Sequence, residues 1–218
     1  QKQLVLEKNT EILDSITYAK RIQTAILPSE TLRAELLSEH FIVYEPKDIV
    51  AGDFYWIEQL NDWTLVAAAD CTGHGVPGAM MSVVCHNALN RSVREFGLTI
   101  PGEILDKTRE LIVLELSKNN EQVNDGMDIS LCAWNKSTQQ LRWSGANNPL
   151  WIIRKNGTIE EVKPLKQPIG KYDDYSPFPT HEIQIEKGDL LYLFTDGYSD
   201  QFGGENGKKF KTKNFKRL

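Results

Sequence analysis

Residues 65–75 read Leu-Val-Ala-Ala-Ala-Asp-Cys-Thr-Gly-His-Gly, an apolar run that ends in Asp70 at the mouth of a glycine turn. Residues 190–197, Leu-Leu-Tyr-Leu-Phe-Thr-Asp-Gly, repeat this arrangement and end in Asp196. The first run predicts a central strand that is covered on both faces, and the second predicts another apolar strand that ends in the same kind of turn. A carboxylate at the end of a buried strand is costly to desolvate unless a positive charge pairs with it. Neither turn contains Lys or Arg, so the pattern indicates that a cation supplies the charge.

A third aspartate, Asp53, follows Gly52 just before the strand that pairs with the Asp70 strand in a predicted hairpin. We therefore expect the carboxylates of Asp53, Asp70 and Asp196 to converge on one site. Ligands that are all oxygen favour a hard ion, Mg²⁺ or Mn²⁺. Two such ions can activate water and offset the charge that develops on a phosphoryl group. The sequence thus predicts a metal-dependent hydrolase.

Composition excludes several other classes of protein. The formal net charge of −5 over 218 residues gives no basic footprint for nucleic acid. No apolar stretch approaches the roughly 20 residues that span a bilayer, so we expect no direct membrane contact in this segment. Three widely spaced cysteines (Cys71, Cys85 and Cys132) fit a reducing cytoplasm and argue against a disulfide framework or a structural zinc site.

The first 36 residues predict a helical, coiled-coil-like linker, and residues 37–218 predict the main domain. Apolar positions at 12, 16, 19, 22 or 23, and 26 follow alternating steps of four and three, and Pro28 ends the helix. Two interpretations fit this stripe. The helix packs on its own domain, or it pairs with a second copy and transmits a signal. Because residue 1 is Gln and not Met, we expect a longer parent chain with an upstream sensor, which could be attached to a membrane.

The main domain predicts strands, then two helices, then strands. This order favours an α+β fold, a four-layer αββα sandwich of two antiparallel sheets flanked by helices. The first helix starts at about Val76 with a buried face of residues 80, 83, 84, 88 and 89. The second covers about 101–117, with residues 104, 105, 108, 111, 112 and 116 on its apolar side. The predicted strands are 40–44, 54–60, 63–69, 129–134, 141–144, 150–154, 158–162, 181–185 and 190–195, with hairpin turns at 61–62 and 156–157.

Five segments resemble, in order, the motifs of the PPM (PP2C-like) metal-dependent serine/threonine phosphatases. The resemblance is to their bacterial branch, typified by SpoIIE and RsbU. The linker segment 18–28, Tyr-Ala-Lys-Arg-Ile-Gln-Thr-Ala-Ile-Leu-Pro, resembles the helix that joins such domains to sensors. The motif segments are Asp53, the run 69–75, Gly-Ala-Asn-Asn-Pro at 145–149, Pro-Ile-Gly at 168–170 and Thr-Asp-Gly-Tyr-Ser-Asp at 195–200.

This resemblance implies roles for individual residues. Asp70 matches the ligand that bridges both metals, and Cys71 contributes its backbone carbonyl. Asp53 matches the early acidic residue that binds or orients metal-bound water, and Asp196 matches a ligand of the second metal. Asp128 matches an acidic position linked to a weaker third metal. Asp53, Asp70 and Asp196 are therefore the candidate catalytic residues.

The resemblance also implies an activity and partners. A Mn²⁺- or Mg²⁺-dependent phosphatase would hydrolyse phosphoserine or phosphothreonine on a regulatory protein of the anti-sigma-factor-antagonist type. Such a domain would form a homodimer through the N-terminal helix and obey an upstream sensor. The alternative is a phosphatase-fold interaction module with an impaired metal site.

The family pattern usually ends with a further metal-binding aspartate after a last helix. Residues 203–218 are rich in Gly and Lys and favour a mobile segment without an acidic strand end. We therefore expect the C-terminal end of the fold to be missing and the second metal to lack a ligand.

Other polar residues near these motifs have two interpretations each. His74 is a general acid or a histidine packed in a glycine turn. Asp200 caps the turn that follows or binds metal. Asn147 and Asn148 form a turn that supports the site.

Overall fold

A computed structural model of the chain describes residues 1–117, 125–204 and 207–218. Its large sheet grows from the predicted hairpin, in which β1 (Phe54–Leu60) and β2 (Trp63–Cys71) pair in antiparallel register around a turn at Asn61. β2 pairs with β3 (Gly126–Asn135), β3 with β4 (Gln140–Ala146), and β4 with β8 (His181–Ile183). The short β7 (Ile169–Gly170) pairs with the first residues of β3. All of these pairings are antiparallel, as the sequence predicts.

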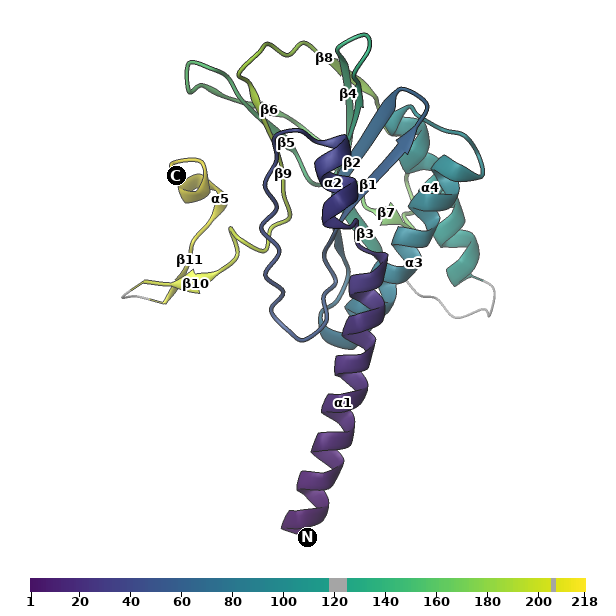
Figure 1. Cartoon of the computed structure of the whole chain (residues 1–218), viewed down its shortest axis with the longest axis vertical. Coiled ribbons are helices and arrows are strands. Elements are labelled where there is room, and N and C mark those ends of the chain that lie inside the picture. The colour runs from purple at the N-terminus through teal and green to yellow at the C-terminus, as the bar shows by residue number, and fades with distance from the viewer. Residues whose placement is uncertain (118–124, 205–206) are drawn as a thin grey trace.

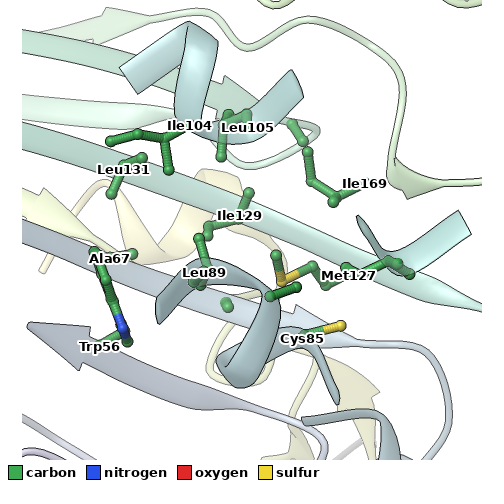
Figure 2. Close-up of a cluster of buried hydrophobic side chains, with 14 of the residues drawn as sticks. Trp56, Ala67, Cys85, Leu89, Ile104, Leu105, Met127, Ile129, Leu131 and Ile169 are labelled. Carbon is green, nitrogen blue, oxygen red and sulfur yellow. The ribbon is translucent and has the colours of Figure 1, made fainter. Parts of the chain in front are cut away.

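Two helices cover one face of this sheet, α3 (Gly75–Arg94) and α4 (Pro101–Leu116) (Figure 1). Figure 2 shows Leu89 of α3 and Ile104 and Leu105 of α4 directed at strand residues such as Ile129. The apolar side predicted for α4 is confirmed, since five of its six residues are buried and Leu116 packs against the same core. Burial of a large aliphatic side chain contributes about 1.5–3 kcal/mol, so this helix–sheet interface is a main source of stability.

The second sheet has the order β6 (Ile159–Val162), β5 (Leu150–Ile153), β9 (Leu190–Leu193). Alternate residues Leu150 and Ile152 face the large sheet and join a second core with Trp143. Trp151 points to the opposite face, where Phe215 packs on it at 5.1 Å between ring centroids. Phe215 belongs to α5 (Thr212–Phe215), which supplies helical cover for this outer face among the described residues. The order helix, sheet, sheet, helix confirms the predicted α+β sandwich, with a fourth layer of one helical turn in the described part of the chain.

Several predicted elements differ in the structure. Residues 40–44 form no strand; they run as an extended segment in which Phe41 packs on Tyr192 of β9, 5.7 Å between ring centroids. The segment 203–218, which the sequence predicts to be mobile, contains regular structure among its described residues. β10 (Phe202–Gly203) pairs with β11 (Lys208–Lys209), and α5 follows.

The buried face predicted for α3 is partly wrong. Met80 and Val83 point to solvent with 64% and 36% of their surface exposed. Ala79, Ser82 and Cys85 are buried instead, because the crowded approach of this helix to the β1–β2 end admits small side chains.

The N-terminal region contains α1 (Lys2–Ile26), which extends away from the sheets (Figure 1), and α2 (Glu30–Leu36), which starts at the Ser29 cap. Gln23 is the buried residue of α1. Its amide donates to the Ala51 carbonyl at 2.6 Å and to Ser82 Oγ at 2.9 Å, and its oxygen accepts from the Ala51 N–H at 2.9 Å. The end of α1 therefore packs on its own domain. Within the described residues, no helix is long and apolar enough to cross a membrane.

Candidate functional site

Three of the predicted aspartates lie side by side across neighbouring strands. Asp70 and Asp128 are Cα partners in the β2–β3 register, and Asp53 directly precedes Phe54, whose partner Ala69 precedes Asp70. Flanking residues such as Ala69 and Cys71 belong to the core beneath the helices. Because successive strand side chains alternate between faces, Asp70 and Asp128 point to the side of the second sheet. The site therefore lies where one end of the large sheet meets the second sheet.

Asp196 reaches this row from the second sheet. It follows the end of β9, and its carboxyl lies close enough to that of Asp70 for the two groups to influence each other's pKa. Thr195 Oγ1 donates to Asp53 Oδ2 at 2.6 Å, and Tyr44 Oη donates to the Asp53 carbonyl at 3.1 Å. Thus Asp53 is held by two groups that lie outside the sheet carrying it. The structure thus brings the side chains of Asp53, Asp70, Asp128 and Asp196 near one another, and their roles stay predictions.

Close backbone packing fixes the turn that follows Asp70. A Cβ added to Gly52 would lie 2.8 Å from the Gly73 carbonyl oxygen, and one added to Gly78 would lie 2.5 Å from the same oxygen. Gly73 itself has φ +87°, which favours glycine. These three glycines let α3 and the loop before β1 approach each other through backbone atoms. The approach sets the position of Asp53 relative to Asp70.

The carboxyls act electrostatically on one another. Burial raises the pKa of Asp70 to about 8, and the nearby charges of Asp53, Asp196 and Asp128 raise it as well. Burial and the charge of Asp200 raise the pKa of Asp196, although its interaction with the Asp70 carboxyl lowers it. Burial also raises the pKa of Asp128, whereas the hydrogen bond from Asn147 and the charge of Lys166 lower it. The cluster therefore favours positive charge, from protons or from a cation.

The chemistry of these donors fits a hard divalent cation. They are carboxylate oxygens, and no ion pair joins Asp53, Asp70 or Asp196 to Lys or Arg among the residues described. Their present arrangement is not that of a finished ligand set. Across the described ranges, no three His, Cys, Asp or Glu side chains are placed to hold one metal ion together.

The neighbouring residues resolve several sequence interpretations. The Cys71 thiol is buried, and both a hydrogen bond with Cys85 and burial raise its pKa, so it is not a thiolate ligand here. His74 is not packed in its turn; it is exposed, directly precedes α3 and lies 3.2 Å from Asp48. The side chain of Asp200 pairs with Lys209 at 2.6 Å.

The supporting asparagines behave as turn formers. Asn147 has φ +55° and donates to Asp128 Oδ1 at 2.8 Å. Lys166 Nζ in turn donates to the Asn147 carbonyl at 3.4 Å. Sequence reasoning missed Thr195, Lys166, Tyr44 and Asp48. The Thr-Asp-Gly motif was a signal for Thr195, but no local pattern ties it to Asp53, which lies 142 residues away.

Comparisons with known proteins agree with this geometry. Residues 61–218 match the family model described as Stage II sporulation protein E (SpoIIE). The phosphoserine phosphatase RsbU of Bacillus subtilis (strain 168) is 26% identical over 196 residues, which is 87% of this chain. The chain spans 55% of the length of that relative.

Solved structures show the same fold. The SiaA-PP2C domain of Pseudomonas aeruginosa matches with a TM-score of 0.86 and 34% identity, covering 96% of this chain and 82% of that one. RsbX in complex with magnesium matches with a TM-score of 0.52 and 17% identity, covering 68% of each chain.

Proposed function

The chain belongs to the SpoIIE family, which has the PP2C-type phosphatase fold, and we propose from this that it is a protein serine/threonine phosphatase. The single observation that carries the proposal is the convergence of Asp53, Asp70 and Asp196 from three separate segments. A carboxylate cluster without a basic partner suits cation-assisted phosphoryl chemistry. RsbU, named a phosphoserine phosphatase, adds support for the same reaction class.

We assign the metal to these residues. Asp70, the Cys71 carbonyl, Asp53 and Asp196 would hold the ions, and Asp128 would contribute to a further, weaker site. When bound, Mn²⁺ or Mg²⁺ supplies positive charge to the phosphoryl group and makes water a better nucleophile. The structure of RsbX with magnesium supports this choice of ion class.

The chain's own residues orient this site. Thr195 and Tyr44 hold Asp53, and Asn147 holds Asp128. We propose that water attacks phosphorus directly while the bond from phosphorus to the serine or threonine oxygen breaks. No Gly-x-Ser-x-Gly nucleophile motif occurs in the sequence, and Ser199, the serine nearest Asp196, donates to its backbone carbonyl.

The family resemblance suggests a class of substrate and a way in which the activity is regulated. We propose a phosphorylated regulatory protein of the anti-sigma-factor-antagonist type as substrate, and an upstream sensor that acts through α1. Gln23 supports the second point, because it bonds to Ala51, two residues before Asp53. A cytoplasmic location is supported by three buried free cysteines.

Hydrolysis of an aryl phosphate and of a phosphoserine peptide with Mn²⁺ tests the proposal. We expect metal-dependent turnover that chelation removes and that Asp70→Asn reduces by at least about 100-fold, because the bridging carboxylate is lost. Asp62→Asn, in the exposed β1–β2 turn, is the matched control and should retain activity. A folded protein that is silent with both Mn²⁺ and Mg²⁺ would instead support the interaction-module alternative.

A further inference from the structure

Positive charge is concentrated at one end of an acidic molecule. Residues 207–218 contain six of the 25 Lys and Arg residues and no Asp or Glu. The rest of the chain therefore has 19 basic and 30 acidic residues, a formal net charge of −11. Such an asymmetry creates a local field that attracts anionic partners to one place on the surface.

The structure attaches this basic segment to the loop that carries Asp196. The Lys211 N–H donates to the Ser199 carbonyl at 2.7 Å, and the Phe210 N–H donates to the Gln201 carbonyl at 2.8 Å. The rings of Phe210 and Phe215 both pack on Tyr198, at centroid distances of 5.7 and 4.8 Å. The backbone of the basic segment is therefore bonded to Ser199 and Gln201, which follow Asp196 by three and five residues.

Two of the six cations have structural partners. Lys209 pairs with Asp200, and Lys216 pairs with Glu161 on the second sheet. Lys208, Lys211, Lys213 and Arg217, which we call the basic tail surface, are exposed and form no ion pair with any described residue. Lys213 lies in α5 and Arg217 follows two residues after its end, and both are exposed. These charges are available to a partner.

The neighbouring site explains why such charges would be useful. Asp53, Asp70 and Asp196 repel an acidic protein that approaches them, whatever the state of its phosphoryl group. A basic surface on the segment that is bonded to the loop after Asp196 can hold the flanking acidic residues of a phosphoprotein and bring the phosphoryl group near. A nucleic acid fits less well, because its continuous backbone would also meet the surrounding surface of an acidic body.

We propose that the basic tail surface is a docking site for an acidic segment of a phosphoprotein substrate. The proposal rests on the proposed phosphatase function, and it adds the charge class of the substrate. It predicts that acidic residues close to the phosphoserine increase binding, and that salt weakens it.

Binding can be measured without catalysis, by fluorescence anisotropy of labelled phosphoserine peptides at low ionic strength without metal. One peptide has Asp and Glu around the phosphoserine, and the other has Ser, Gly and Asn. We expect the variant with Lys208→Gln, Lys213→Gln and Arg217→Gln to bind the acidic peptide about tenfold more weakly than the wild type. Binding of the neutral peptide should not change.

A matched variant removes three charges elsewhere. Lys136→Gln, Lys155→Gln and Lys187→Gln lie in exposed turns at the ends of strands away from Asp70 and Asp196, and should leave binding unchanged. Equal binding by the tail variant and the wild type, or equal weakening in both variants, would overturn the proposal. Tighter binding of a single-stranded RNA than of the acidic peptide, lost in the tail variant, would also overturn it.

Aryl phosphate hydrolysis with Mn²⁺, measured on the same samples, separates the two proposals. Equal turnover by the wild type and the tail variant shows that the tail variant is folded and its site intact. If the wild type does not hydrolyse phosphate but the peptide difference persists, the phosphatase assignment fails and the docking surface stands. If hydrolysis occurs without a peptide difference, only the docking proposal fails.

Discussion

At the scale of single residues, Asp70 lies in an environment that strongly disfavours its charged form. Its carboxyl is half-buried and close to the charges of Asp53, Asp196 and Asp128. A pKa raised to about 8 means that the folded chain keeps a proton that the unfolded chain releases above pH ~4. In the absence of metal, the free energy of unfolding therefore decreases as pH rises from about 4 to 8.

This linkage predicts that Asp70→Asn stabilises the metal-free protein while it removes activity. An amide carries no charge, so the part of the pH-dependent loss that comes from Asp70 should disappear, and the variant should melt several degrees higher than the wild type at pH 8. Thermal unfolding in chelator from pH 5 to 8 measures this effect, with Asp62→Asn as the surface control. Parallel pH profiles for the wild type and Asp70→Asn would contradict the prediction.

At the scale of elements, the β2–α3 turn positions the site through contacts between backbones. Gly52, Gly73 and Gly78 come from three segments and leave no room for a methyl group at two of the three positions. A helix that starts this close to a strand end can hold Asp53 and Asp70 at fixed separation. As a consequence, a small change in the β2–α3 turn would move the carboxyl groups of Asp53 and Asp70.

We therefore expect Gly78→Ala to destabilise the fold by about 1–3 kcal/mol, since its Cβ would meet the Gly73 carbonyl and the helix would have to shift. The shift would also reduce phosphatase activity, because Gly52 directly precedes Asp53. Gly203→Ala is the control, as its Cβ meets nothing within 4 Å. Chemical denaturation gives the free energies, and similar midpoints for the two variants would refute the argument.

At the scale of the whole molecule, α1 has two different halves. Gln23 ties its end to the domain, whereas Leu4, Val5, Leu6, Ile12 and Leu13 are each more than half exposed on the part that extends away (Figure 1). Val5 and Ile12 are one heptad apart, and exposed apolar side chains at this spacing are typical of a coiled-coil seam. The end of α1 therefore packs on its own domain. For the rest of α1, pairing with a second copy of the chain stays a prediction.

Pairing through the predicted stripe can be tested with Ile12→Lys together with Val5→Lys, which lies one heptad before the first residue of that stripe. These residues are one heptad apart, and charges in a seam should weaken a homodimer by at least about 100-fold. Leu6→Lys with Leu13→Lys is the matched control, because it adds the same charges about 100° around the helix. Sedimentation measures association; a wild-type chain that stays monomeric at high concentration would exclude the dimer.

The sequence by itself determined most of the elements and singled out the candidate site residues. Period-two and period-3.6 patterns are local, so the hairpin at Asn61, the apolar face of α4 and the paired sheets could be predicted from neighbouring residues. Asp53, Asp70 and Asp196 could be found because each stands at the edge of an apolar run, where burial of a carboxylate needs a reason.

Only the tertiary structure decided which surfaces meet. Met80 and Val83 have apolar side chains yet face solvent, while polar Gln23 is buried because Ala51 and Ser82 satisfy its amide. The 40–44 segment has strand-like residues but finds no partner strand, and packs on β9 through Phe41. The contact of Thr195 with Asp53 joins the two ends of the domain. Whether a side chain is buried or exposed depends on partners that are distant in the sequence, because they complete its hydrogen bonds or cover its apolar face. No local sequence pattern identifies these partners.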